Sequence, residues 1–497
     1  MGARETPTDV LLVQAAIRHP QDDHLHNRAF NRYFSSMRRL AAAMDFNSLV
    51  TRAVPSPPTT MLSLAAYLRA QRIRVAVADL NLSFLADGIT PETELITRLE
   101  QDRPRILAIG AMESYLLEAV YRLARTARDY DPGLYIVVGG VNATAIDAAI
   151  LKTGKVDAVV RGEGEETLTA LCRTVLAHGD LRNVEGISHR HEGQVVRNPD
   201  RPFLDLATLP LPARDIYPLA RMYALNGGVD AVYGSRGCPA ACLFCHGPNF
   251  WKRQWRGRPP GEVVRELGDI ATQGGRVALL YDMNFGHRPA WALEIARQIE
   301  QAPWHLTWGC ELRVDHLLDR AFLEALYRAG CHSVFVGLES TDPLTLAGID
   351  KGYTCEALET ALSNAARVGI GVEATVMIGL PEDTATSIRQ TTDAVLDLFH
   401  DGRLKLVHYF LCVPWAGTAL GDRPEDYGVE VVCRNPANLI TAPSIPLAST
   451  RRLAPDAVYA LWEEGVERLD AAVKQKLMLI GLKQSFVTEV TAPCHRA

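Results

Sequence analysis

The 497-residue sequence predicts an α/β protein with two parallel sheets. Short apolar segments alternate with amphipathic segments over the first 200 residues, which is typical of a doubly wound, Rossmann-like sheet. A proline-rich stretch interrupts this pattern, and the alternation starts again at about residue 231. We therefore expect a Rossmann-like domain at 1–200, a linker at 201–230, a partial (β/α)6 barrel at 231–420 and a small, mostly helical capping region at 421–497.

The first domain contains five predicted strands, at residues 9–14, 73–79, 105–110, 135–140 and 158–162. Helical periodicity covers residues 61–71, 115–130 and a segment that begins at about 165. Ligands of a parallel sheet bind at the carboxyl ends of its strands. Glycines stand at these ends, and they fit a nucleotide site, a flavin site or simple tight turns: Gly110, Gly139, Gly140, Gly162 and Gly164. The first strand is not followed by GxGxxG, which argues against the usual dinucleotide fold.

The second domain repeats the strand and helix alternation. Its predicted strands lie at 231–233, 276–281, 305–309, 333–340, 371–381 and 406–411. A further strand-like segment at 311–315 directly follows the third of these strands. Six strand and helix units indicate a partial barrel, and barrels carry their functional residues at the carboxyl ends of the strands.

Three cysteines in residues 234–245 (Gly-Ser-Arg-Gly-Cys-Pro-Ala-Ala-Cys-Leu-Phe-Cys) have the spacing CxxxCxxC. Cys238, Cys242 and Cys245 can bind three irons of a [4Fe-4S] cluster and leave the fourth iron open to a small molecule. The alternatives are chance spacing and a zinc site. Zinc requires four ligands, and the nearest candidate, His246, follows Cys245 too directly to reach the same ion. The other seven cysteines are expected to be small buried side chains.

Composition limits the functional classes. The net charge is −6 and no dense run of Lys or Arg occurs, so we expect no nucleic-acid partner. No stretch of about 18 apolar residues and no secretory signal are present, so we expect no membrane association and a cytoplasmic location. Reducing cytosol also suits an oxygen-sensitive cluster better than disulfides.

The cysteine motif and the segments from about 230 to 420 resemble the radical S-adenosylmethionine (SAM) enzymes. The resemblance implies that the open iron chelates SAM and that the reduced cluster cleaves it to a 5′-deoxyadenosyl radical. An external low-potential donor of the flavodoxin or ferredoxin type would supply the electron. The resemblance further implies that six residues contact SAM: Phe244 and Gly379 near adenine, Asp282 at the amino group, Arg313 at the carboxylate, and Glu339 and Ser340 at the ribose or methionyl end. An internal ion network of the barrel is the alternative for Asp282, Arg313 and Glu339.

Three ordered segments of the first domain resemble the cobalamin-binding domain that precedes the barrel in one large radical SAM class. They are Pro57-Pro58 before residues 62–68, residues 137–144, and residues 156–167. The implied cobalamin contacts lie in three loops: Glu113 and Ser114; Gly139, Gly140, Val141 and Asn142; Gly162, Glu163 and Gly164. The sequence lacks Asp-x-His-x-x-Gly after the first strand, so we expect cobalamin without a histidine below cobalt and interpret His24 and His26 as loop residues.

The two resemblances together imply a cobalamin-dependent radical SAM methyltransferase. Such an enzyme transfers a methyl group from SAM through methylcobalamin to an unactivated carbon, or to phosphorus, of a small metabolite after the radical abstracts a hydrogen atom. Cyclisation or ring rearrangement without methyl transfer is the alternative reaction. A cobalamin-binding sensor or carrier is the non-enzymatic alternative, and it would leave the three cysteines without a purpose. The sequence names no catalytic residue and no substrate.

Overall fold

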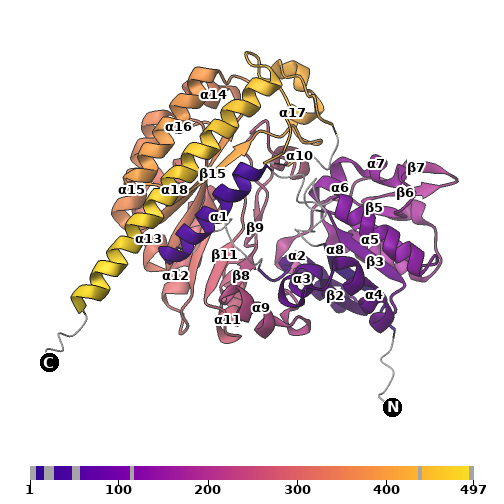
Figure 1. Ribbon diagram of the computed structural model, residues 1–497. Helices are drawn as coiled ribbons and strands as arrows, with labels where there is room; N and C mark the ends of the chain where they lie inside the picture. The colour runs from indigo at the N-terminus through magenta and orange to yellow at the C-terminus, as the bar shows by residue number, and fades with distance from the viewer. Residues whose placement is uncertain are drawn as a thin grey trace.

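The computed structural model describes residues 7–15, 27–46, 56–111, 117–434, 439, 440 and 442–491, with backbone only from 482 onward. Two α/β units lie next to each other (Figure 1). The N-terminal unit is built on a seven-stranded sheet and the second unit on a six-stranded parallel sheet. The predicted fold class is confirmed.

The first sheet has the strand order β2-β1-β3-β4-β5-β6-β7. Its first five strands are parallel and match the predicted ones to within two residues: β1 (Val10–Gln14), β2 (Val75–Asp79), β3 (Ile106–Gly110), β4 (Tyr135–Gly139) and β5 (Ala158–Val160). The hairpin of β6 (Ile187–His191) and β7 (Gln194–Arg197) adds two antiparallel strands that the sequence did not predict. Its strands are polar, and its turn takes positive φ at Glu192 (50°) and Gly193 (80°).

Helices cover both faces of this sheet, which is therefore doubly wound. One apolar cluster lies under α2 (Thr59–Ala70) and α8 (Gly164–Leu176), and another lies under α4 (Pro91–Asp102) and α5 (Leu117–Tyr130). Shorter helices follow the strand ends: α3 (Leu80–Asp87), α6 (Val141–Ala145) and α7 (Asp147–Lys152). The carboxyl ends of β1, β3 and β4 remain uncovered by these helices and point toward the second unit.

The second sheet is parallel, with its strands in chain order: β8 (Val229–Val232), β11 (Val277–Leu280), β12 (Thr307–Leu312), β13 (Cys331–Glu339), β14 (Gly371–Ile378) and β15 (Leu406–Leu411). The segments predicted at 305–309 and 311–315 form one strand, β12, followed by a 3-10 turn. The outer helices are α11 (Pro260–Thr272), α12 (Pro289–Glu300), α13 (Arg320–Arg328), α15 (Cys355–Val368) and α16 (Ala385–His400). Minor elements are α9 (Leu219–Asn226), β9 (Ser235–Arg236), α10 (Gly247–Phe250), β10 (Arg256–Gly257), α14 (Pro343–Gly348) and α17 (Ala419–Asp422).

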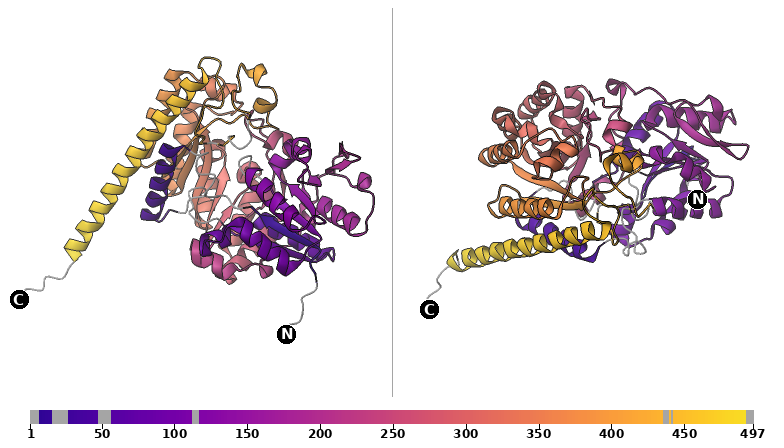
Figure 2. Two further views of the ribbon diagram at one scale, coloured as in Figure 1. Left: turned by 45° about the vertical axis from the view of Figure 1, so that its right-hand side comes forward. Right: turned by 90° about the horizontal axis from the view of Figure 1, so that it is seen from above.

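Helix α1 (Arg28–Ala43) belongs to the second unit, although the sequence placed it in the first domain. It lies along the long C-terminal helix α18 (Pro455–Thr491), on the outside of the barrel (Figures 1 and 2). Phe30 of α1 stacks on Trp462 of α18, with ring centroids 6.1 Å apart, and Tyr33 donates a hydrogen bond to the carbonyl of Val407 in β15. The apolar side of this amphipathic helix is therefore buried against a partner more than 400 residues away.

The C-terminal region ends in the long helix α18 (Pro455–Thr491), and only the part before this helix approaches the mouth of the barrel. Arg451 donates its backbone N–H to Pro381, and Thr450 donates its hydroxyl to the carbonyl of Asp383, just after β14. Helix α18 then runs down the side of the barrel against α16 and β15. No helix among the described residues is long and apolar enough to cross a membrane.

Candidate active site

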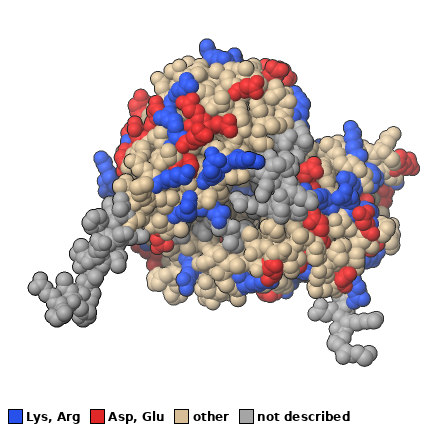
Figure 3. Space-filling view, in the orientation of Figure 1, with Lys and Arg blue, Asp and Glu red and all other residues tan. Residues whose placement is uncertain are grey.

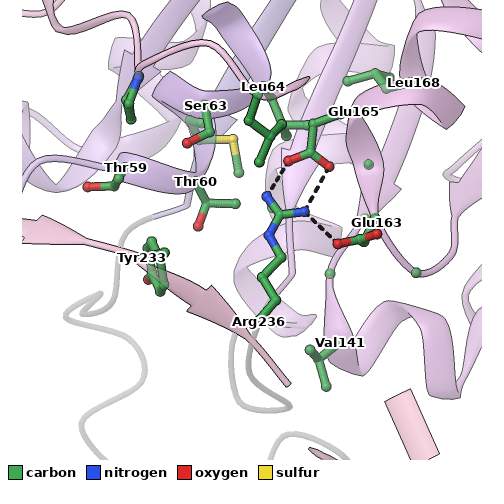
Figure 4. Close-up of a pocket in the computed structure, with 18 of the residues that line it drawn as sticks. Thr59, Thr60, Ser63, Leu64, Val141, Glu163, Glu165, Leu168, Tyr233 and Arg236 are labelled. Atoms are coloured by element: carbon green, nitrogen blue, oxygen red, sulfur yellow. Dashed lines mark hydrogen bonds and ion pairs between the residues drawn. The ribbon is translucent and has the colours of Figure 1, made fainter. Parts of the chain in front are cut away.

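A cavity of about 300 Å³ lies between the two units, at the carboxyl ends of the first sheet. The strand order places the topological switch between β1 and β3, where a doubly wound sheet binds its ligand. The cavity is lined by Leu12 of β1, Gly110 of β3, Gly139 of β4 and residues of α2, and on the opposite side by the segment from Tyr233 to Gly237 and by Tyr281. Figure 4 shows part of this lining, including Ser63 and Leu64 of α2 and Tyr233 and Arg236 of the second unit.

Six of the residues predicted to contact cobalamin line this cavity: Gly139, Gly140, Val141, Gly162, Glu163 and Gly164. Gly162 has φ +69°, and a Cβ atom there would meet no atom within 4 Å. The positive φ therefore requires glycine at position 162, and the space beside its Cα atom is not filled by protein atoms. Asn142 is buried in α6 and does not line the cavity. Glu113, Ser114, His24 and His26 lie outside the described residues.

The three motif cysteines lie in the loop between β9 and α10. Burial raises the pKa of Cys245 to about 11, and burial also raises that of Cys242, where Lys351 and Arg313 act in the opposite direction. Metal binding removes the thiol protons, and these two cations favour the thiolate form. Within the described ranges no three His, Cys, Asp or Glu side chains converge on one metal ion. A cubane cluster does not require such convergence, because each thiolate binds a different iron.

Glu339 lies at the end of β13 in a left-handed conformation with φ +60°, at an irregularity in the β13–β14 pairing. Its carboxylate accepts hydrogen bonds from Lys351 at 2.7 Å and from Thr375 at 3.1 Å. The Lys351 ammonium is also 5.7 Å from the ring centroid of Phe244 in the cysteine loop. A non-glycine residue with such a backbone is a strained point, and strained residues concentrate at functional sites.

Asp282 and Arg313 have protein partners. The carboxylate of Asp282 is completely buried and accepts hydrogen bonds from the backbone N–H groups of Gly234 and Ser235. Burial raises the pKa of Asp282 to about 6. Arg313 donates to the carbonyl of Lys351 and to Asp315. Asp282 therefore fixes the segment that leads into the cysteine loop, and contacts of either residue with SAM stay a prediction.

Ser340 and Gly379 also lie at strand ends. The hydroxyl of Ser340 is 3.3 Å from that of Thr391 and accepts a hydrogen bond from the N–H of Asp342. Gly379 has φ +86°, and a Cβ atom there would lie 2.8 Å from Val458 of α18. The glycine is therefore required by its backbone and by the approach of α18. An additional close approach of adenine stays a prediction.

Sequence reasoning missed an arginine between the cysteine loop and the first domain. Arg236 lines the cavity, and its guanidinium bonds Glu163 at 2.7 Å and Glu165 at 2.5 Å (Figure 4). The only local signal was an arginine two residues before Cys238, with an acidic run in residues 163–166 far away in the sequence.

Carboxyl groups also face the inside of the barrel. Glu311 of β12 and Glu373 of β14 alternate with residues such as Cys310 and Val372, which pack against the outer helices. Glu373 is bonded to His408 of β15 at 2.6 Å, and neither side chain is exposed. Burial, with the neighbouring Asp282 and Glu373, raises the pKa of Glu311 to about 8. At neutral pH Glu311 is therefore mainly a protonated acid that can donate a hydrogen bond.

Acidic and basic side chains are mixed on the face drawn in Figure 3. Arg28, Arg32 and Arg39 are exposed on α1, and exposed acidic residues of α18 include Glu467. This face carries no single-sign field of the kind that attracts a polyanion.

Comparisons with known proteins agree with this geometry. The B12 binding domain model matches residues 49–172, and the Radical SAM superfamily model matches residues 232–395. The chain therefore carries a B12-binding domain followed by a radical SAM domain.

An uncharacterized methyltransferase of Pyrococcus horikoshii is 27% identical over 77% of this chain and 82% of its own length. The anaerobic magnesium-protoporphyrin IX monomethyl ester cyclase of Synechocystis is 32% identical over 60% of this chain and 59% of its own length. The solved structure of the radical SAM methyltransferase TsrM from Kitasatospora setae, with cobalamin and a [4Fe-4S] cluster bound, superposes with a TM-score of 0.68. It covers 93% of this chain and 89% of that one at 18% identity, which shows the shared fold.

Proposed function

We propose that this radical SAM enzyme is a cobalamin-dependent methyltransferase that acts on a carbon, or on phosphorus, of a small molecule. The observation that carries the proposal is the cavity between the two units. The glycine-containing loops of the B12-binding domain line one side of it, and the segment that leads into the three cysteines lines the other. A methyl carrier and a radical source held in these places would lie on either side of one shared space.

The residues present fit the proposed cofactors. Cys238, Cys242 and Cys245 would hold a [4Fe-4S] cluster, and Lys351 and Arg313 favour the thiolate form of Cys242. The open backbone at Gly162 and the other glycine-bearing strand ends would hold cobalamin. When bound, SAM with the cluster supplies a 5′-deoxyadenosyl radical, and cobalamin supplies a methyl group.

The protein contributes position and exclusion of water. Asp282 holds the start of the cysteine loop through two backbone N–H groups. Apolar side chains such as Met61, Leu64 and Leu168 line most of the cavity, so charged reactants would be held in a poorly hydrated space. Inside the barrel, Glu311 offers a protonated carboxyl that can donate a hydrogen bond to a substrate.

Two further parts of the proposal follow from the chemistry of the cluster. Each SAM cleavage consumes one electron, so we propose an external low-potential donor of the flavodoxin or ferredoxin type. An oxygen-sensitive cluster also needs reducing surroundings, and we propose a cytoplasmic location.

The test measures both products of SAM. The anaerobically reconstituted enzyme is incubated with a low-potential reductant, methyl-labelled SAM and a candidate substrate. Methyl transfer predicts that 5′-deoxyadenosine and S-adenosylhomocysteine form in similar amounts and that the label enters the product. Deoxyadenosine and converted substrate, without S-adenosylhomocysteine or label transfer, would contradict methyl transfer.

That second outcome would support cyclisation, the other candidate function. The observation in its favour is the identity of 32% to the Synechocystis cyclase. A cyclase has no use for the methyl group of SAM, so the two functions differ in one measurable product.

A further inference from the structure

The two units are joined at the cavity by a group of four charged side chains. Arg236 bonds Glu163 at 2.7 Å and Glu165 at 2.5 and 3.3 Å. Arg256, which pairs with Arg236 in the β9–β10 ribbon, bonds the same Glu163 at 2.9 and 3.1 Å. We call these four residues the inter-domain ion network.

The network connects two segments that the backbone holds firmly. Glu163 and Glu165 stand on either side of Gly164, at the start of α8. On the other side, Gly237 separates Arg236 from Cys238. Gly237 has φ +86°, and a Cβ atom there would overlap the carbonyl of Gln254. The backbone between Arg236 and Cys238 therefore has little conformational freedom. A shift of the cysteine loop should displace the Glu163 to Glu165 segment, and a shift of that segment should displace the cysteine loop.

The network is mostly buried. The carboxylates of Glu163 and Glu165 are only 6% and 5% exposed, and the side chain of Arg236 is 19% exposed. Burial opposes ionisation of Glu163, but its bonds to Arg256 and Arg236 bring its pKa below the ordinary value. Each charge thus depends on its partners, because an unpaired buried charge is strongly disfavoured.

We propose that Arg236 is a positioning residue through which cobalamin binding and cluster assembly strengthen each other. The inference rests on the cofactors of the proposed function. A cluster on Cys238 fixes the adjacent Arg236, and a fixed Arg236 holds the Glu163 to Glu165 segment in the shape that lines the cobalamin cavity. Linkage makes the effect reciprocal: each cofactor raises the affinity for the other by the same factor, on the order of tenfold for a typical coupling.

The experiment measures cobalamin affinity by anaerobic spectrophotometric titration of cluster-loaded and cluster-free protein. The unaltered chain should bind cobalamin about tenfold more tightly when the cluster is present. In Arg236→Gln, with iron content checked, the cobalamin affinities of the cluster-loaded and the cluster-free protein should agree to within about twofold, because the bonds from position 236 to Glu163 and Glu165 are missing. Arg128→Gln is the matched control, because Arg128 bonds Asp157 at 2.6 Å inside the first domain. The ratio of cobalamin affinities with and without the cluster should be the same in this variant as in the unaltered chain.

The affinity ratio separates positioning from a merely structural role. Loss of a structural contact would weaken cobalamin binding equally with and without the cluster, and an unchanged ratio in Arg236→Gln would overturn the proposal. Equal affinities in the unaltered chain would also overturn it. If Arg236→Gln does not fold, Glu165→Gln keeps the Glu163 bonds and should give an intermediate ratio, and an unchanged ratio would again contradict coupling. Absence of any cobalamin binding by the unaltered chain would contradict the proposed function itself.

Discussion

Replacement of Glu311 by glutamine is expected to stabilise the protein at neutral pH. The half-buried carboxyl inside the barrel has its pKa raised from 4.5 to about 8 by desolvation and by the neighbouring Asp282 and Glu373. Between these two values the unfolded chain ionises Glu311 and the folded chain does not, so folding stability falls as the pH rises from about 4.5 to 8 and then levels off. Glutamine has nearly the same shape and no proton to lose, so Glu311→Gln removes this loss.

The expected gain follows from linkage. Each pH unit above the ordinary value of 4.5 is worth about 1.4 kcal/mol, so the gain at pH 7 is about 3 kcal/mol. Well below pH 4.5 the carboxyl is protonated in both the folded and the unfolded chain, and the gain should vanish, apart from the difference between an amide and an acid.

The assay is urea unfolding of the unaltered chain and Glu311→Gln at pH 5.0 and 7.0, with Glu118→Gln, an exposed position on α5, as control. Compared with the unaltered chain, Glu311→Gln should have a higher free energy of unfolding at pH 7.0 and a much smaller increase at pH 5.0. The free energy of unfolding of the control should change little at either pH. A loss of stability at pH 7.0, or a difference that does not depend on pH, would show that Glu311 is ionised in the fold and would refute the reasoning.

Two further predictions concern the cluster and a buried ion group that Arg214 of the linker forms with Asp230 of β8 and Glu266 of α11. Replacement of Cys238, Cys242 and Cys245 by alanine should abolish iron binding after anaerobic reconstitution, whereas Cys433→Ala should keep it; iron and sulfide analysis decides, and a full cluster in the triple variant would reject the assignment. Arg214→Leu should destabilise the protein by about 3–5 kcal/mol, because it leaves the carboxylate of Asp230, 0% exposed, without a cation, whereas Glu266 keeps its bond to Arg258. Arg297→Leu, which removes an exposed pair with Glu294, should shift the urea midpoint little, and an equal shift in both variants would contradict the argument.

Local sequence pattern was sufficient for the elements whose burial follows from their own residues. The parallel strands are short apolar runs that a sheet covered on both faces requires, so the twelve predicted segments correspond to eleven observed strands. The cysteine spacing and the glycines at strand ends are local as well, and they indicated the two places where cofactors would bind. The polar β6–β7 hairpin was missed because its strands lack that apolar signal.

Tertiary structure decided the features that depend on residues far apart in the chain. The sequence analysis predicted no helix at residues 28–43, and only the fold shows that the apolar side of α1 packs on β15 and α18 rather than on the first sheet. Glu163 was predicted from its loop, yet its binding to Arg236 and Arg256 depends on how the two units meet. The raised pKa of Glu311 likewise arises from carboxyl groups on other strands. A sequence pattern reports which residues become buried, whereas charge pairing and ionisation depend on which neighbours the completed fold places beside them.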